Sequence, residues 1–161
     1  MKAISFKHIT KKHIGVFIAF FIVSIALDRW VKILMLEGFV WDSEALTIGG
    51  YALVYNKGVA FSMFSFLQEY LKYIQILFLC AVLLFALWSD FFMKHYVPLG
   101  MLLGAGLSNI IDRFIYGGVV DYVYWHYGFD FAIFNLADVL IDCAVALIIW
   151  QILREKKHSK D

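Results

Sequence analysis

The sequence predicts an all-α membrane protein with four transmembrane helices and a small periplasmic β-sheet. Of the 161 residues, 63% are hydrophobic and only 17% are charged, whereas soluble domains average roughly 45–50% apolar residues. Four separate segments also approach the about 20 apolar residues that a helix needs to cross a bilayer. With one proline and eleven dispersed glycines there is no linker composition. Residues 1–161 are therefore predicted to form a single integral membrane domain.

The four predicted spans are residues 14–36, 70–88, 96–114 and 134–153. Lys11 and Lys12 precede the first span as in a cleavable signal peptide. However, no small-x-small cleavage pattern follows, and Asp28, Arg29 and Lys32 come instead. We interpret this segment as a retained anchor. An even number of spans places both termini on the same side of the membrane.

Orientation follows from the basic residues, most of which lie on the side of the two termini. They are Lys2, Lys7, Lys11, Lys12, Lys94, Arg154, Lys156, Lys157 and Lys160. The positive-inside rule makes that side cytoplasmic. Residues 37–69 and 115–133 are then expected to face outward, which in a bacterium means the periplasmic face of the inner membrane.

Two glycine patterns predict local structure. Residues 45–48 and 51–55 flank Gly49 and Gly50, whose freedom to adopt positive φ predicts a hairpin turn within an outer β-hairpin region at about 40–65. In the third span, Gly100, Gly104 and Gly106 would let helix backbones approach closely in lipid.

Polar and charged side chains gather at the outer ends of the spans and in the outer loops. Burying a charge in the hydrocarbon costs about 2.5–3.5 kcal/mol or more, so such a cluster in a membrane chain indicates a functional site. The members are Asp28, Lys32, Asn109, Asp112, Arg113, Asp121, Asn135 and Asp138.

Several of these residues also have a structural interpretation. Asp28 and Lys32 are four residues apart, the spacing of a helical ion pair. Asp112 beside Arg113 is expected to be a supporting pair or a contact with lipid headgroups.

Asn135 and Asp138, three residues apart, have the spacing of a helix N-terminal cap. Asp121 has no such role in its sequence context, and its loop can fold back over the fourth span. Two carboxylates held close together share a proton, so one serves as a base and the other as an acid toward a water molecule. Asp121 and Asp138 therefore indicate an aspartyl-protease arrangement.

Other chemistries have less support in the residues. His126 lacks the further ligands that a zinc site needs, so no metal or other cofactor is expected. Ser62 and Lys57 are the only outer candidates for a serine–lysine dyad. Cys80 and Cys143 lie in apolar runs, and a net charge of +1 argues against nucleic-acid binding.

Two other functions remain as alternatives. A proton-coupled carrier or channel would use acids as a relay, but a relay places acids along the membrane depth, and these lie almost entirely at one end. A non-catalytic assembly or chaperone subunit gives no reason for Asp121 and Asp138 to converge.

Five sequence blocks in order resemble the signal peptidase II family, the lipoprotein signal peptidases, over almost the whole chain. The blocks are DRWVK at 28–32, NKGVAF at 56–61, GLSNIIDR at 106–113, GGVVDY at 117–122 and FNLAD at 134–138. This resemblance implies that Asp121 and Asp138 are the catalytic pair. It also implies substrate-binding or supporting roles for Asn56, Asn109, Arg113, Asn135, Asp28 and Lys32.

The resemblance further implies the substrate: a prolipoprotein whose cysteine carries a diacylglyceryl group and which is cut just before that cysteine. Membrane lipids would surround the enzyme, globomycin-type cyclic peptides would inhibit it, and the outer sheet would form a periplasmic cradle.

Asp142 lies outside these blocks, one helical turn after Asp138. Helical spacing directs it the same way as Asp138 and slightly deeper. We expect it to raise the proton affinity of the pair, or to bond Asn109 or a water molecule as a neutral donor.

Overall fold

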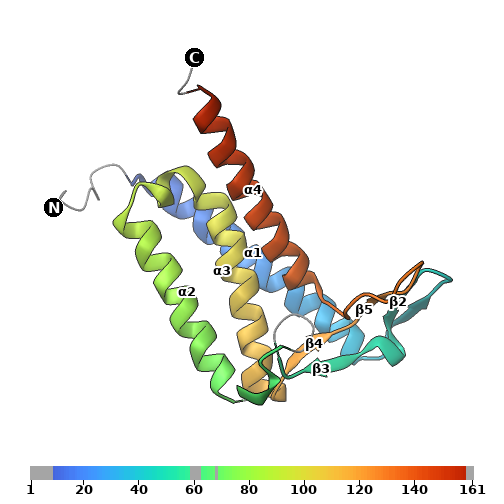
Figure 1. Ribbon diagram of the computed structural model, residues 1–161. Helices are drawn as coiled ribbons and strands as arrows, with labels where there is room; N and C mark the ends of the chain where they lie inside the picture. Colours follow the sequence, from blue (N-terminus) through green and yellow to red (C-terminus); the bar gives the residue numbers. More distant parts are fainter. Residues whose placement is uncertain (1–8, 59–62, 68, 159–161) are drawn as a thin grey trace.

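The computed structural model describes residues 9–58, 63–67 and 69–158, and it places four long helices beside two small antiparallel sheets (Figure 1). The helices are α1 Lys11–Leu36, α2 Tyr70–Trp88, α3 Phe91–Tyr116 and α4 Leu136–His158. Each covers the greater part of a predicted span. Lys2, Lys7 and Lys160, the 59–61 part of the NKGVAF block, and Ser62 lie outside the described residues.

Helix α3 lies between α2 and α4 and also packs on α1 (Figure 1). Its glycines make the α1 contact possible. A Cβ on Gly100 would lie 2.6 Å from the carbonyl oxygen of Phe17, and one on Gly104 would collide with the Phe21 backbone. The predicted close approach of small residues in the third span is confirmed.

Three described helices are long and apolar enough to cross a membrane: α1, α2 and residues Leu136–Lys157 of α4. Helix α3 is not among them. It carries Lys94, Asp112 and Arg113, and its polar side chains near the sheets are buried against other parts of the protein. A helix surrounded by other elements need not be apolar all round, which explains why it falls short of a lipid-facing composition.

Five short strands form the two sheets. Strands β1 (Val40–Asp42), β2 (Leu46–Gly49) and β5 (Val123–Trp125) pair in the order β1-β2-β5, while β3 (Val54–Asn56) pairs with β4 (Val119–Asp121). Both sheets lie at one end of the helices, and α1 begins and α4 ends at the other (Figure 1).

The small sheet was expected, but the predicted hairpin at the double glycine is wrong. Gly49 and Gly50 do have positive φ angles of 70° and 55°. They lead into the 3-10 turn η2 (Gly50–Ala52), and the strand after it pairs with β4 rather than with β2. The hairpin turn lies earlier, at Ser43, whose hydroxyl accepts a hydrogen bond from the Leu46 amide at 3.1 Å.

Gly117 determines how the third helix connects to the sheets. It has φ 72° and terminates α3 in the left-handed conformation that commonly ends a helix. The chain reverses there and enters β4 directly. The end of α3 and the strand that carries Asp121 are therefore adjacent.

Candidate active site

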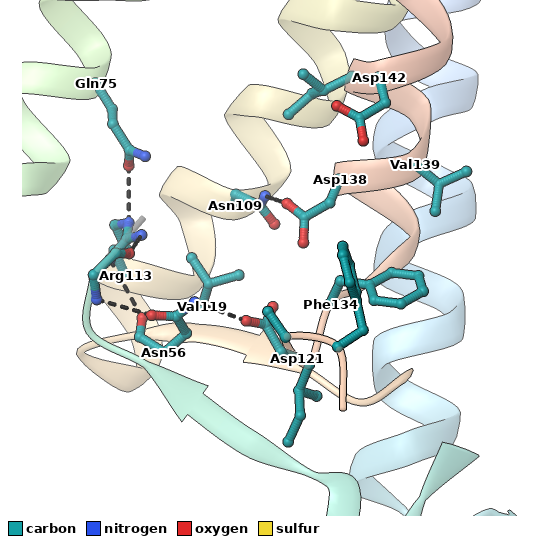
Figure 2. A pocket seen from close by; sticks show the side chains of 15 residues that line it. Asn56, Gln75, Asn109, Arg113, Val119, Asp121, Phe134, Asp138, Val139 and Asp142 are labelled. Atoms are coloured by element: carbon teal, nitrogen blue, oxygen red, sulfur yellow. Dashed lines mark hydrogen bonds between the residues drawn. The ribbon is translucent and has the colours of Figure 1, made fainter. Parts of the chain in front are cut away.

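Asp121 and Asp138 line the same pocket, which has a volume of about 490 Å³ and lies where the C-terminal part of α3 and the N-terminal part of α4 meet the β3–β4 sheet (Figure 2). Asp121 reaches it from β4, and Asp138 reaches it from the first turn of α4. The two carboxylates are separated by 17 residues of chain but face one cavity.

Asp121 is positioned by the β3–β4 ladder. Val54 pairs with Asp121, and Asn56 pairs with Val119, so Asn56 is the diagonal neighbour of Asp121 on the same face. Its side-chain amide donates to Asp121 Oδ2 at 3.0 Å, and Asn135 Nδ2 donates to Oδ1 at 2.7 Å.

Burial and the nearby Asp138 raise the pKa of Asp121 to about 6, from 3.8. The two amide hydrogen bonds favour the ionised form but do not cancel the effect of desolvation. Asp121 therefore binds a proton at a pH where an exposed aspartate has lost it.

Asp138 is part of the cap of α4, as its spacing from Asn135 predicted. The Asp138 amide donates to Asn135 Oδ1 at 3.0 Å, and the Asn135 amide donates to Asp138 Oδ2 at 3.1 Å. This reciprocal pair is a capping box. Asn109 Nδ2 donates to the other carboxylate oxygen at 3.0 Å, which fixes the rotamer of Asp138 toward the pocket (Figure 2).

Two buried amides connect the acids. Asn135 Nδ2 donates to Asp121 and, at 3.2 Å, to Asn109 Oδ1, which also accepts from Lys32 Nζ at 2.8 Å. Both acceptor positions of the Asn109 oxygen are thereby occupied. The orientation of each amide is set by partners on both sides.

Lys32 is the centre of an ion cluster beneath the acids. Its ammonium group lies 2.7 Å from Asp28 and 2.7 Å from Asp112, and all three side chains are fully buried. With the bond to Asn109, its three donors are used. The predicted Asp28–Lys32 pair is confirmed. Asp112 was expected to pair with Arg113 or with headgroups, and that prediction is wrong: it bonds Lys32 and Arg29.

The two carboxylates of this cluster also hold backbone next to the acids. Asp28 accepts from the Ala137 amide at 2.9 Å, one residue before Asp138. Asp112 accepts from the Val120 amide at 3.1 Å, one residue before Asp121. One buried lysine thus indirectly connects both segments that carry the pocket carboxylates.

Arg113 reaches the opposite wall of the pocket. Its guanidinium donates to Gln75 Oε1 at 2.8 Å and to the carbonyl oxygens of Asn56 and Gly58 (Figure 2). It therefore fixes the segment that follows β3, and through Asn56 it acts on Asp121. All eight residues selected from the sequence belong to one connected network.

Sequence reasoning missed several members of this network. Ser108 donates to Asp28 at 2.6 Å, the Tyr122 hydroxyl accepts from the Leu136 amide at 3.0 Å, and Gln75 bonds Arg113. Ser108 and Tyr122 lie within the sequence blocks that resemble the family, and this position could have identified them as members of the site. Gln75 is an uncharged polar residue in a largely apolar span, and a polar residue at such a position also indicates a functional role.

Asp142 lines the same pocket one turn deeper than Asp138 (Figure 2). Its side chain is exposed, and within the described residues it forms no hydrogen bond. The expected bond to Asn109 is absent because Lys32 and Asn135 occupy the Asn109 oxygen and Asp138 accepts from its amide.

In the part of the chain that the structure describes, no three His, Cys, Asp or Glu side chains are grouped to hold a metal ion. His126 instead follows β5 directly, and its Nε2 lies 3.1 Å from the Thr47 hydroxyl. The pocket offers three carboxylates, those of Asp121, Asp138 and Asp142, together with several amides and one guanidinium. This set can activate a water molecule by proton transfer.

Comparison with known proteins agrees with this chemistry. The family model for Signal peptidase (SPase) II matches residues 20–154. The lipoprotein signal peptidase of Wolinella succinogenes is 59% identical over 138 residues, covering 85% of this chain and 92% of that protein. Those of Helicobacter pylori and Campylobacter jejuni are each 48% identical over 153 residues, covering 94% of this chain and 96% of theirs.

Two solved structures share the fold, both described as bacterial membrane enzymes determined by the in meso method. One has a TM-score of 0.75 and 27% identity, covering 90% of this chain and 92% of its own. The other has a TM-score of 0.72 and 28% identity, covering 87% and 94%. On the match of the family model and of relatives over nearly their full length, the chain belongs to the signal peptidase II family of proteases.

Proposed function

We propose that this protein is an aspartic endopeptidase of the bacterial inner membrane that removes the signal peptide from diacylglyceryl-modified prolipoproteins, cutting just before the lipidated cysteine. The observation that carries the proposal is that Asp121 and Asp138 line one pocket and are tied together by Asn135. Family membership supports the choice of substrate.

The pair catalyses hydrolysis by moving protons. The ionised carboxylate takes a proton from a water molecule as the water oxygen attacks the scissile carbonyl carbon, and the protonated carboxyl donates to the carbonyl oxygen. A tetrahedral diol forms. The first carboxyl then passes its proton to the cysteine nitrogen and the C–N bond breaks, while one hydroxyl of the diol returns its proton to the second carboxylate. A carboxylic acid and a free amine result, and the pair regains its starting protonation. The amides of Asn56, Asn109 and Asn135 hold the two carboxyl groups in position throughout.

The proposed orientation puts this chemistry at the periplasmic face. Helix α3 is the third of four spans, and it packs against the three apolar helices. Lys11 and Arg154 lie at the ends of α1 and α4 away from the sheets, which the positive-inside rule makes cytoplasmic. Residues 1–161 act as one domain with both termini in the cytoplasm, and membrane lipids contact the exposed apolar faces of the helices.

The decisive experiment compares a diacylglyceryl-modified prolipoprotein with its unlipidated form, using the purified full-length chain. We expect cleavage of the lipidated form only. Chelators and serine-directed reagents should leave the rate unchanged, and a globomycin-type cyclic peptide should inhibit it. Inhibition by a chelator, or equal cleavage of both forms, would contradict the proposal.

The pKa of Asp121 predicts a pH dependence. Because the folded value of about 6 lies above the ordinary 3.8, the folded protein retains a proton between these values that the unfolded chain has released. This contribution to stability is present at acid pH and is lost as the pH rises through about 6. Since the active pair holds one proton, kcat/KM should decline above roughly pH 6.

Infrared or carbon-13 NMR titration of the carboxyl groups measures the same proton directly. In Asp138→Asn the neighbouring negative charge is gone, so the pKa of Asp121 should fall. An unchanged titration in that variant would show that the two carboxylates do not interact.

Asp142 gives a separate prediction. Its side chain lines the pocket without touching the hydrogen-bond network of the acids, so Asp142→Asn should keep most of the wild-type kcat and barely move the pH profile. Asp142→Leu removes a polar, exposed group from the pocket wall and should lower activity more than the amide does. If Asp142→Asn were as inactive as Asp138→Asn, three carboxylates would take part in the reaction.

A further inference from the structure

We propose that an apolar trough beside the catalytic pocket binds one acyl chain of the substrate's diacylglyceryl group. This inference rests on the proposed function and specifies which part of the protein recognises the lipid. The trough has a volume of about 290 Å³, and its lining residues lie on α2, α3 and α4. Its lining residues are Gln75, Phe78, Leu79, Leu102, Gly106, Asn109, Ile110, Ile141 and Val145.

The trough and the catalytic pocket adjoin. Gln75, Asn109 and Ile141 line both, and Asn109 also bonds Asp138. All the lining residues of the trough other than Gln75 and Asn109 are apolar or glycine. A ligand that enters from the acids therefore passes from a polar cavity into one that offers only van der Waals contact.

The direction and length of the trough fit an acyl chain. Its α3 residues run from Asn109, near the acids, to Leu102, which at 1.5 Å per residue is about 10 Å farther from the sheets. The lipid is attached to the cysteine that follows the scissile bond, so its chains begin inside the catalytic pocket and extend toward the membrane interior. A leucine side chain of the signal peptide is too short to fill this length.

Gly106 keeps the trough open. A Cβ at this position would lie 3.1–3.2 Å from the two terminal carbons of Leu79 on the facing helix. A larger side chain would therefore push against the flexible end of Leu79 and occupy the trough. No backbone atom blocks it, so the helix packing is expected to survive the change.

The trough contributes position rather than net hydrophobic attraction. An acyl chain that leaves lipid for an apolar protein surface exchanges one apolar environment for another. What it gains is a fixed location for the attached cysteine, and placing the reacting bond correctly against the carboxylates affects the rate strongly.

The test uses synthetic lipopeptides that differ only in acyl length, one with hexadecanoyl and one with butanoyl chains. Wild-type enzyme should cleave the long-chain peptide about tenfold more efficiently in kcat/KM, the size of discrimination that an apolar pocket achieves. Gly106→Leu should remove this preference by slowing cleavage of the long-chain peptide only. Gly15→Leu is the control, because nothing lies within 4 Å of a Cβ at Gly15 on α1.

A second measurement does not depend on the variant folding. A long-chain lipopeptide with a photoreactive group in the acyl chain should label Phe78, Leu79 or Val145 of the wild-type enzyme, as read by mass spectrometry. Labelling confined to lipid-facing residues such as Ile22 would overturn the proposal, as would equal cleavage of both chain lengths by the wild type.

Two further outcomes distinguish failure of the acyl-chain inference from failure of the proposed function. If Gly106→Leu changes the preference for the signal-peptide residue three positions before the cysteine and not for acyl length, the trough holds a side chain and the inference is wrong. If the wild type cleaves neither lipopeptide nor a full lipidated prolipoprotein, the proposed function itself fails.

Discussion

Asp121→Asn and Asp138→Asn should each lower kcat by about a thousandfold or more, within the range that acid–base groups contribute. An amide keeps the size of the side chain but cannot exchange the proton that the reaction moves. In both variants the remaining carbonyl oxygen can still accept one of the present hydrogen bonds, from Asn135 to Asp121 or from Asn109 to Asp138. The protein should therefore stay folded and membrane-inserted.

Asp130→Asn is the matched control for this prediction. It makes the same chemical change in an exposed loop residue, whose carboxylate accepts a hydrogen bond from the Tyr124 hydroxyl at 2.7 Å and from no other described residue. Turnover of a lipidated prolipoprotein and thermal melting are measured for all three variants. Near-wild-type turnover in either pocket variant would exclude the two-aspartate mechanism, and a large drop in melting temperature would attribute the loss to unfolding.

The helices could be predicted from sequence because the membrane imposes a length and a composition on them. The spans at 14–36 and 70–88 agree with α1 and α2 to within three residues at every end. The third predicted span, at 96–114, corresponds to α3, which is not among the three described helices that are apolar enough to cross a membrane. Its composition departs from that of a lipid-facing helix because its neighbours are protein, and this cannot be seen in one segment alone.

The sheet pairing could not be predicted because strand partners are chosen by tertiary contacts. Double glycine allows a hairpin but does not require one. Here β2 is held between β1 and β5, and the Gly49 amide donates to the Tyr122 carbonyl at 2.9 Å. The residues beyond Gly50 are then free to pair with β4. The positive φ angles of Gly49 and Gly50 were predicted correctly. The strand that pairs with β3, however, lies more than 60 positions away in the sequence.

For the candidate site, too, the sequence predicted one part and could not predict another. Residue types and spacing selected the eight polar positions, because each is costly in a membrane chain unless it has a use. They did not indicate that Asp112 holds the Val120 amide, or that Asp28 holds the Ala137 amide. The Asp28 bond joins residues 109 positions apart, and the Asp112 bond crosses the chain reversal at Gly117. Only the folded arrangement therefore reveals that the buried ions support the two acids.

The second large effect is expected at Lys32. Lys32→Met removes the ammonium group from between Asp28 and Asp112 and leaves two fully buried carboxylates facing each other. Removing one partner of a buried ion pair typically costs about 3–5 kcal/mol, because the remaining charge is uncompensated. We expect a loss of this size in unfolding free energy, measured by denaturant titration in detergent micelles.

Lys94→Met is the control, since it also removes one lysine from an ion pair. The Lys94–Glu155 pair spans 2.6 Å, but its side chains are 51% and 47% exposed. Such exposed pairs contribute about 0–1 kcal/mol. A loss at Lys32 no larger than the loss at Lys94 would contradict the role of the buried cluster.

The same variants distinguish a role of Lys32 in positioning the pocket side chains from a role in stability alone. Asp112→Asn in the Lys32→Met background removes one of the two carboxylate charges that Lys32 had neutralised, so the double variant should be more stable than Lys32→Met by itself. A double-mutant cycle measures this coupling. Its turnover should stay low, because Asn109 has still lost the Lys32 donor that orients it toward Asp138. Stability and activity would then recover to different extents. If both returned together, Lys32 would serve only to neutralise charge, and the positions of Asp121 and Asp138 would be fixed by the sheets and the α4 cap alone.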